Sequence, residues 1–330
     1  MLKQYKKIIL LLAVLCIIGL ALNAQGHRAK EEVSKSQDNR VNADASNFVN
    51  RDLVSPDLKH LITNRYGGSA SDYYFGLQGG CTDGQYIYYM FIIKNVSTRE
   101  IVDCAMEKCS VDANGLIVVN NSRIGLKAIG HANNITYNAK TNQFIAVHNG
   151  SGTSNQLHLL SADPNQLFAN PADDLEVSTV YLKCKVDTIN YNPVYDKYIA
   201  GLSGNTFDYV ILNSDFKIEK SYLCSDKFDT NFGRQGMCSD ENYIYFLYSF
   251  DSTSGNNYGN KVKVFDWNGK KVCDQDLPEE CGYFESQNIV IRNNTIYIGF
   301  YTDTRPSKTY YRINQVYKLP NILYNTIRKK

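Results

Sequence analysis

Five polar residues, each heading a short run of alternating apolar residues, are the first candidates for chemistry in this chain. They stand 55, 54, 48 and 52 positions apart, and each carries an amide or carboxylate oxygen. Amides donate and accept hydrogen bonds and carboxylates accept them strongly, which suits sugar hydroxyls or peptide groups. The residues are Gln78, Asn133, Asp187, Gln235 and Gln287.

Two of these residues lie in nearly identical segments. FGLQGGCTDGQYIY covers residues 75–88 and FGRQGMCSDENYIY covers 232–245, with nine identities in fourteen positions. Looser copies accompany the other three residues, each with a turn and a further strand pattern. Repetition every 50 or so residues with several short strands per unit is typical of β-propeller blades. We therefore predict an all-β fold: a single five-bladed β-propeller with four antiparallel strands per blade.

The innermost strand of each blade lines the central channel of a propeller. These strands are expected near residues 78–83, 133–138, 187–192, 235–240 and 287–292. The five polar residues then form a ring at one rim of the channel, together with His131, Lys185, Arg234 and Glu285. Convergent polar groups in a concave site favour ligand binding, so all of these are predicted ligand-binding residues. In the alternative, the amides bond one another and close the ring without a ligand.

The ends of the chain predict how the ring closes. Residues 57–330 are assigned to the propeller, whose last repeat lacks a fourth strand. LKHLITNRY, residues 58–66, is predicted to supply this strand from the N-terminal side, which removes an exposed sheet edge. Residues 25–56 are polar and without periodicity, as expected of a flexible tether.

Residues 1–24 resemble a secretory signal peptide. Three lysines precede an apolar run over 8–22, and small residues follow at Ala21 and Ala24. We expect cleavage after one of these alanines and a secreted or cell-envelope location. In the alternative, the segment stays uncleaved and is the protein's one attachment to a membrane.

The composition and the cysteine spacing bear on which partners, metals and cross-links are expected. A net charge of +2 without a basic stripe argues against nucleic-acid binding. No Cys-x-x-Cys pair is present, so neither a metal nor a cofactor is expected. The cysteine pairs closest in sequence are candidate disulfides, Cys104–Cys109 and Cys273–Cys281. We expect a monomer.

These observations leave three classes of function. The first is an exported binding module without catalysis, whose partner is a glycan or a cell-surface polymer. The second is a propeller-fold glycoside hydrolase or glutaminyl cyclase that uses His131, Asp187 and Glu285; a glycosidase would need its two carboxylates about 5–9.5 Å apart. The third is a structural envelope protein that contacts other proteins.

Three segments resemble the helveticin J-like family of secreted bacteriocins. They are His131-Ala-Asn before a strand, Gln235-Gly-Met before SDENYIYFLYS, and FESQNIVIRNNTIYIGFYTD leading into NQVYKL. The resemblance covers about three of the five repeats. It implies a secreted propeller that binds or acts on bacterial cell surfaces. Five-bladed glycoside hydrolases usually carry an acid in an early inner strand, where this chain has Gln78.

Overall fold

The computed structural model describes residues 48–50, 52–148, 154–203, 208–223, 233–251, 258–278, 281, 284–301 and 314–319. All of them belong to the compact unit Ala43–Lys330. The predicted signal segment and most of the predicted tether lie outside the described residues. Within the described ranges, no helix is both long enough and apolar enough to cross a membrane.

In these ranges, antiparallel strands form four sheets. The first contains β1 (Tyr73–Thr82), β2 (Ile87–Asn95), β3 (Ile101–Val111) and β4 (Ile117–Arg123). The second contains β5 (Ile135–Asn138), β6 (Gln143–Val147), β7 (Ser154–Ser161), β8 (Ser178–Asn192), β9 (Lys197–Leu202), β10 (Tyr209–Leu212) and β11 (Ile218–Tyr222). The third contains β12 (Gly233–Ser239), β13 (Tyr243–Asp251), β14 (Tyr258–Asp266) and β15 (Lys271–Asp276). The fourth contains β16 (Glu285–Arg292), β17 (Thr295–Tyr301) and β18 (Asn314–Leu319). The 3-10 helices η2 (Ala70–Asp72) and η3 (Lys127–Ile129) precede β1 and β5.

The length of β8 explains the seven-stranded sheet. Its first half pairs with β7, where Ser178 lies opposite Leu159, and its second half pairs with β9, where Asn192 lies opposite Lys197. One strand is therefore the last member of the group β5 to β8 and the first member of the group β8 to β11.

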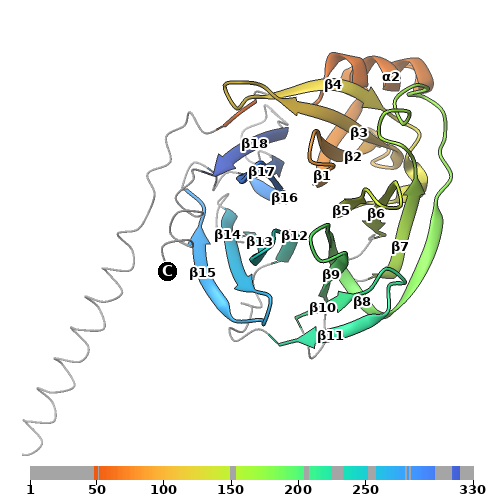
Figure 1. The fold of residues 1–330 in the computed structure, drawn as a ribbon. Helices are drawn as coiled ribbons and strands as arrows, with labels where there is room; N and C mark the ends of the chain where they lie inside the picture. The colour runs from red at the N-terminus through yellow and green to blue at the C-terminus, as the bar shows by residue number, and fades with distance from the viewer. Residues whose placement is uncertain are drawn as a thin grey trace, which may run out of the picture. The chain divides into compact units, whose positions relative to one another are not determined.

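The first strands of the successive groups form a closed ring. β1 contacts β5, β5 contacts β8, β8 contacts β12, β12 contacts β16, and β16 returns to β1. Figure 1 looks into this ring: β1, β5, β12 and β16 lie toward the middle, and β4, β11 and β15 lie at the edge. The predicted all-β fold is confirmed.

The repeated Gln-Gly pair has a packing reason. A Cβ atom on Gly79 would lie 2.7 Å from the carbonyl oxygen of Ala132, and one on Gly236 would lie 3.0 Å from Asn288 Cα. Both glycines face the backbone of a neighbouring inner segment, and the Gly79 N–H donates to the Ala132 carbonyl oxygen at 3.0 Å. Glycine permits an approach that any side chain would block.

Residues 58–66 form a helix, so the prediction of a closing strand there is wrong. Helix α2 (Pro56–Tyr66) begins after Ser55, whose side chain accepts a hydrogen bond from Leu58 N, and ends at Gly67 with φ of 78°. An N-cap serine followed by proline in the first turn, with glycine after the last, favours a helix. These signals are local, and they outweigh the missing strand of the last repeat.

The segment that closes the ring lies just upstream, at residues 48–50 and 52–54. Val49 N donates to Val316 O at 2.9 Å, and Leu53 N donates to Asn314 O at 2.9 Å. This segment therefore runs along β18 and covers its outer edge. The chain enters the packed unit before the predicted end of the tether.

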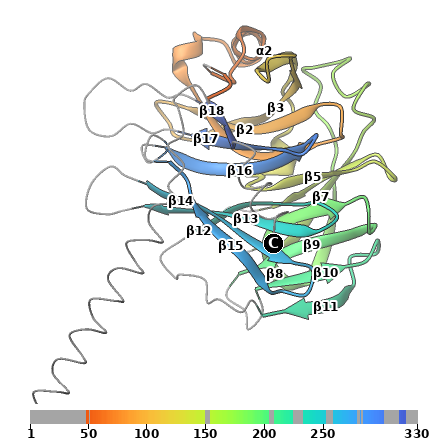
Figure 2. The same cartoon turned by 60° about the vertical axis from the view of Figure 1, so that its left-hand side comes forward.

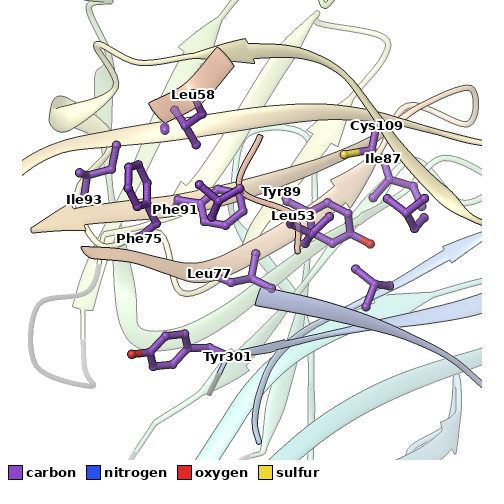
Figure 3. Close-up of a cluster of buried hydrophobic side chains, with 14 of the residues drawn as sticks. Leu53, Leu58, Phe75, Leu77, Ile87, Tyr89, Phe91, Ile93, Cys109 and Tyr301 are labelled. Atoms are coloured by element: carbon purple, nitrogen blue, oxygen red, sulfur yellow. The ribbon is translucent and has the colours of Figure 1, made fainter. Parts of the chain in front are cut away.

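Figure 3 shows the hydrophobic cluster that this segment completes. Leu53 of this segment packs with Leu58 of α2. Both lie in one cluster with Phe75 and Phe91 of the first sheet and Tyr301 of β17. The cluster thus joins the first and last sheets, which are far apart in sequence. In Figures 1 and 2, α2 lies outside the strands of the first sheet, where it contacts β4.

The predicted disulfides are absent. Cys104 and Cys109 both lie on β3, an odd number of residues apart, so their side chains point to opposite faces of the sheet and join different core clusters. No disulfide joins Cys104 to Cys109 or Cys273 of β15 to Cys281 in the structure. Proximity in sequence therefore misled the prediction.

Candidate functional site

Most of the predicted polar residues lie at local distortions of the inner strands. The pairing register shifts in β1, β8, β12 and β16, where an extra residue bulges from the strand. Such bulges re-aim side chains and are common beside active sites. The shifts occur at Gln78, Asp187, Gln235 and Gln287, and Asn133 stands just before β5. We call these five residues the amide ring; it lies at the end of the channel where the inner strands begin.

The amide ring is partly accessible. Gln78 and Gln287 are buried, at 6% and 5% exposure. Asn133, Asp187 and Gln235 are partly exposed. A ligand at this end would therefore meet the last three side chains directly.

A buried arginine joins two inner strands at the amide ring. Arg234 Nη1 lies 3.4 Å from Asp187 Oδ1, and the two side chains are 7% and 17% exposed. Arg234 also donates to the carbonyl oxygens of Asp208 at 3.0 Å and Leu202 at 3.2 Å, and its guanidinium lies over the Phe246 ring. Because the guanidinium is planar and held from several sides, it fixes the orientation of the Asp187 carboxylate.

The second predicted acid, Glu285, is held by the residue that follows Arg234 on β12. Gln235 Nε2 donates to Glu285 Oε1 at 3.1 Å. Gln235 directly follows Arg234, so the carboxylates of Asp187 and Glu285 are held by consecutive residues of one strand. The structure thus brings the two predicted acids to the same end of the channel, each with its own partner.

His131 and Lys185 have different surroundings. His131 Nδ1 contacts Asn133 Oδ1, and burial lowers the pKa of His131, which keeps its ring neutral near pH 7. Lys185 is exposed on β8. His131 therefore belongs to the surroundings of the amide ring, and Lys185 lies on the surface.

Two buried asparagines, which the sequence prediction missed, bind the inner strands together. Asn288 Nδ2 donates to Gln78 O at 2.7 Å, and Asn134 Oδ1 accepts from Ile189 N at 2.7 Å. Each directly follows a member of the amide ring and precedes an isoleucine. This shared Asn-Ile pair is the signal that would have found them.

In the ranges that the structure describes, no group of three or more His, Cys, Asp or Glu residues is placed to hold a metal ion. The groups gathered at the amide ring are amides, carboxylates and one guanidinium. These groups recognise hydroxyls, amines and amides.

Comparison with known proteins gives structural similarity only. No model of a known protein family matches the chain, and no curated protein matches it. An exo-β-1,3-galactanase of Phanerochaete chrysosporium with bound β-1,3-galactotriose has 11% identity and a TM-score of 0.49, over 76% of this chain and 61% of that one. The GH43_1 enzyme of Xanthomonas citri complexed with xylose has 9% identity and a TM-score of 0.49, over 84% and 91% of the two chains. An α-L-arabinofuranosidase of Clostridium thermocellum has 11% identity and a TM-score of 0.47, over 73% and 88%.

This chain spans about three fifths of the length of the galactanase chains. All three similar proteins are enzymes by name. Their TM-scores lie below 0.5 and their identities between 9% and 11%, so they assign no function to this chain.

Proposed function

We propose that the described unit is a five-bladed β-propeller that binds a carbohydrate at the amide ring. The seven-stranded sheet is then two blades that share β8, and the segment of residues 48–50 and 52–54 acts as the fourth strand of the last blade. The ligand is a glycan or another hydroxyl-rich polymer of a cell surface, in keeping with the predicted export and with the resemblance to helveticin J-like proteins.

One observation carries this proposal. Equivalent bulges in four inner strands place amide and carboxylate side chains at the same end of the channel. Primary amides donate and accept at once, so a ring of them can satisfy the paired donor and acceptor character of sugar hydroxyls. The paired carboxylate of Asp187 adds one strong, fixed acceptor.

Recognition is favoured by the contacts of Asp187. Its carboxylate is paired with Arg234 and accepts a further hydrogen bond from Thr188 Oγ1 at 3.1 Å. These two contacts hold the carboxylate in one orientation, which suits a hydrogen-bond acceptor for a ligand hydroxyl. The amide ring therefore fits recognition.

Glycoside hydrolysis is the second candidate, and a specific contact supports it. Glu285 is bonded to the neutral amide of Gln235, while Asp187 is bonded to a guanidinium. Two carboxyl groups in unlike surroundings at one end of a channel are the arrangement that acid–base pairs use. In this case Asp187 and Glu285 would be the two catalytic carboxyl groups.

A glycan-binding screen on the purified protein tests the proposal, followed by titration of each ligand found. Asp187→Ala should weaken binding about ten- to a hundredfold, because a lost hydrogen bond to a charged group costs about 1.5–3 kcal/mol. Gln235→Ala should cost less, about 0.5–1.5 kcal/mol. Asp215→Ala, which removes an exposed carboxylate from the β10–β11 turn, is the matched control and should bind normally. Normal binding by the Asp187 and Gln235 variants would overturn the proposal.

Turnover separates the two candidates. Each ligand found in the screen is incubated with protein, and the release of reducing ends is followed. Release that Glu285→Gln abolishes, with binding retained, would establish the hydrolase. Binding without release supports the binding module.

A further inference from the structure

The opposite end of the channel holds a cavity that the amide ring does not share. Its volume is about 260 Å³, and every one of the five inner strands contributes to its wall. A water molecule occupies about 30 Å³ in the liquid, so this space equals the volume of about nine waters. That is below the roughly 300 Å³ at which sites for drug-sized ligands begin. We call it the turn-side cavity, because the turns that follow the inner strands form its mouth.

Most polar side chains of this wall are already satisfied by the protein. Asp83 accepts from the backbone N–H groups of Gln85 and Tyr86 and from the Tyr88 hydroxyl. The Ser239 hydroxyl lies between two asparagine side chains and bonds both. The acceptors of the wall are therefore largely occupied.

Arg292 is the exception among the charged groups of the wall. Its Nε donates to Gln85 O at 3.1 Å, which holds the side chain at the mouth of the cavity. Within the described ranges, its two terminal nitrogens donate to no protein group, and no carboxylate lies within 4.0 Å of them. A guanidinium anchored at Nε keeps its two-pronged face available, which is the face that binds carboxylates.

Asn190 provides a second donor on the same wall. Its Oδ1 accepts from Ser239 Oγ at 2.6 Å, so the side chain is fixed. In the part of the chain that the structure describes, its Nδ2 donates to no protein group. Met237 and Ile289 supply apolar surface between these polar groups.

We propose that the turn-side cavity is a second binding site, specific for a small carboxylate. Arg292 binds the carboxylate through its two terminal nitrogens, Asn190 Nδ2 donates to the same ligand, and the body of the ligand packs on Met237 and Ile289. A free sugar acid and an apolar acid share this chemistry, and the probes below distinguish them. This site is independent of carbohydrate binding at the amide ring.

Calorimetric titration of the purified protein tests the site with three probes: glucuronate, benzoate and neutral glucose. We expect saturable binding of at least one carboxylate below about 10 mM and none of glucose. Arg292→Gln should weaken binding of that carboxylate about tenfold or more. Arg292→Lys, which keeps the charge but loses the two-pronged geometry, should weaken it by a smaller factor. Asn190→Ala should weaken it severalfold.

Two controls separate this site from its alternatives. Lys270→Gln removes a charge from the exposed β14–β15 turn and should not affect binding, and Asp187→Ala should bind the carboxylate normally. If Arg292→Gln melts early, the Asn190→Ala variant still decides, since within the described ranges the Asn190 side chain bonds the Ser239 hydroxyl and no backbone group. Equal binding of glucose and glucuronate, or full binding by Arg292→Gln, would show that Arg292 only ties two turns together.

Discussion

The two near-identical segments build the same structure but differ at the amide ring. In the first, Asp83 accepts from Tyr86 N at 2.6 Å and from the Tyr88 hydroxyl at 2.6 Å. In the second, Asp240 accepts from Tyr243 N at 2.8 Å and from the hydroxyl of the equivalent tyrosine at 2.9 Å. The shared residues therefore make a turn that buries a tyrosine and satisfies its hydroxyl.

The differing residues carry the chemistry. Where the first segment has Leu77, buried in the core, the second has Arg234, which pairs with Asp187. Gln78 is buried, while Gln235 is partly exposed and bonds Glu285. In this pair of repeats, the conserved positions build the blade and the substituted positions build the site.

The third strands differ as well. Tyr89 of β2 pairs with Glu107 of β3, and the equivalent Phe246 pairs with Lys263 of β14. Glu107 is fully buried and accepts from Ser55 N at 3.1 Å and Ser55 Oγ at 2.8 Å, so it anchors the start of α2. Lys263 Nζ instead lies 3.9 Å from Asp274 Oδ2 of β15. The first sheet thus has a buried acid where the third has a base.

The largest expected difference between the sheets is a pH dependence of stability from Glu107. Burial raises the pKa of Glu107 to about 7, against an ordinary value of 4.5. The folded state therefore retains a proton that the unfolded state has lost, and stability falls as the pH rises through this window and levels off above 7. The change amounts to about 3 kcal/mol. Melting temperature measured from pH 4 to pH 8 should fall for the wild type and stay nearly level for Glu107→Gln.

A parallel series with Lys263→Gln serves as the control for this pH dependence. It alters the equivalent position without removing the buried acid, so the slope should match the wild type. A Glu107→Gln protein that keeps the full slope would show that other groups cause it.

The shared glycines provide the next largest effect. Gly79→Ala places a methyl group 2.7 Å from a carbonyl oxygen, and Gly236→Ala places one 3.0 Å from a Cα atom. Overpacking against rigid backbone costs about 1–3 kcal/mol, and the closer contact should cost more. Chemical denaturation should rank the variants wild type, Gly236→Ala, then Gly79→Ala. Gly84→Ala provides a contrast at a glycine whose Cβ would meet no neighbour but whose φ of 93° disfavours it.

Making the second segment more like the first should remove binding. Arg234→Leu copies Leu77 into the second segment and leaves Asp187 without its cation. We expect a loss of about 2 kcal/mol in binding of the ligand found by the glycan screen. Titration should show the loss, and the reverse change, Leu77→Arg, should instead unfold the first sheet because it buries a charge. Unaltered affinity in Arg234→Leu would mean that the pairing with Asp187 has no part in recognition.

The smallest effect is expected where the two segments agree. Asp83→Ala and Asp240→Ala each remove a turn acceptor, at a cost of about 1 kcal/mol by analogy with a lost helix cap. Thermal melting should show nearly equal losses, and glycan binding should not change. A loss of binding in only one of them would indicate that its turn contributes to a ligand site.

Much of the fold could be predicted because it depends on interactions between residues close in sequence, and these recur in each repeat. Period-2 strands, the turn at Asp83 and the recurring polar residues each depend on neighbours within about twenty positions. The local signals at Ser55, Pro56 and Gly67 favour the helix at residues 56–66, whereas the missing strand of the last repeat favours a strand there. The candidate site was predicted as a set of residues and not as a set of contacts.

The sequence by itself determined the strand repeats, the five polar positions and the glycines between the inner strands. Only the tertiary structure decided that Arg234 pairs with Asp187, that Val49 and Leu53 bond the edge of β18, and that Arg292 faces a cavity. The physical reason is the distance along the sequence between the residues that interact. Strand alternation and turns are fixed by steric and hydrogen-bonding rules between near neighbours, whereas a charge finds its partner only when packing brings together strands nearly fifty residues apart.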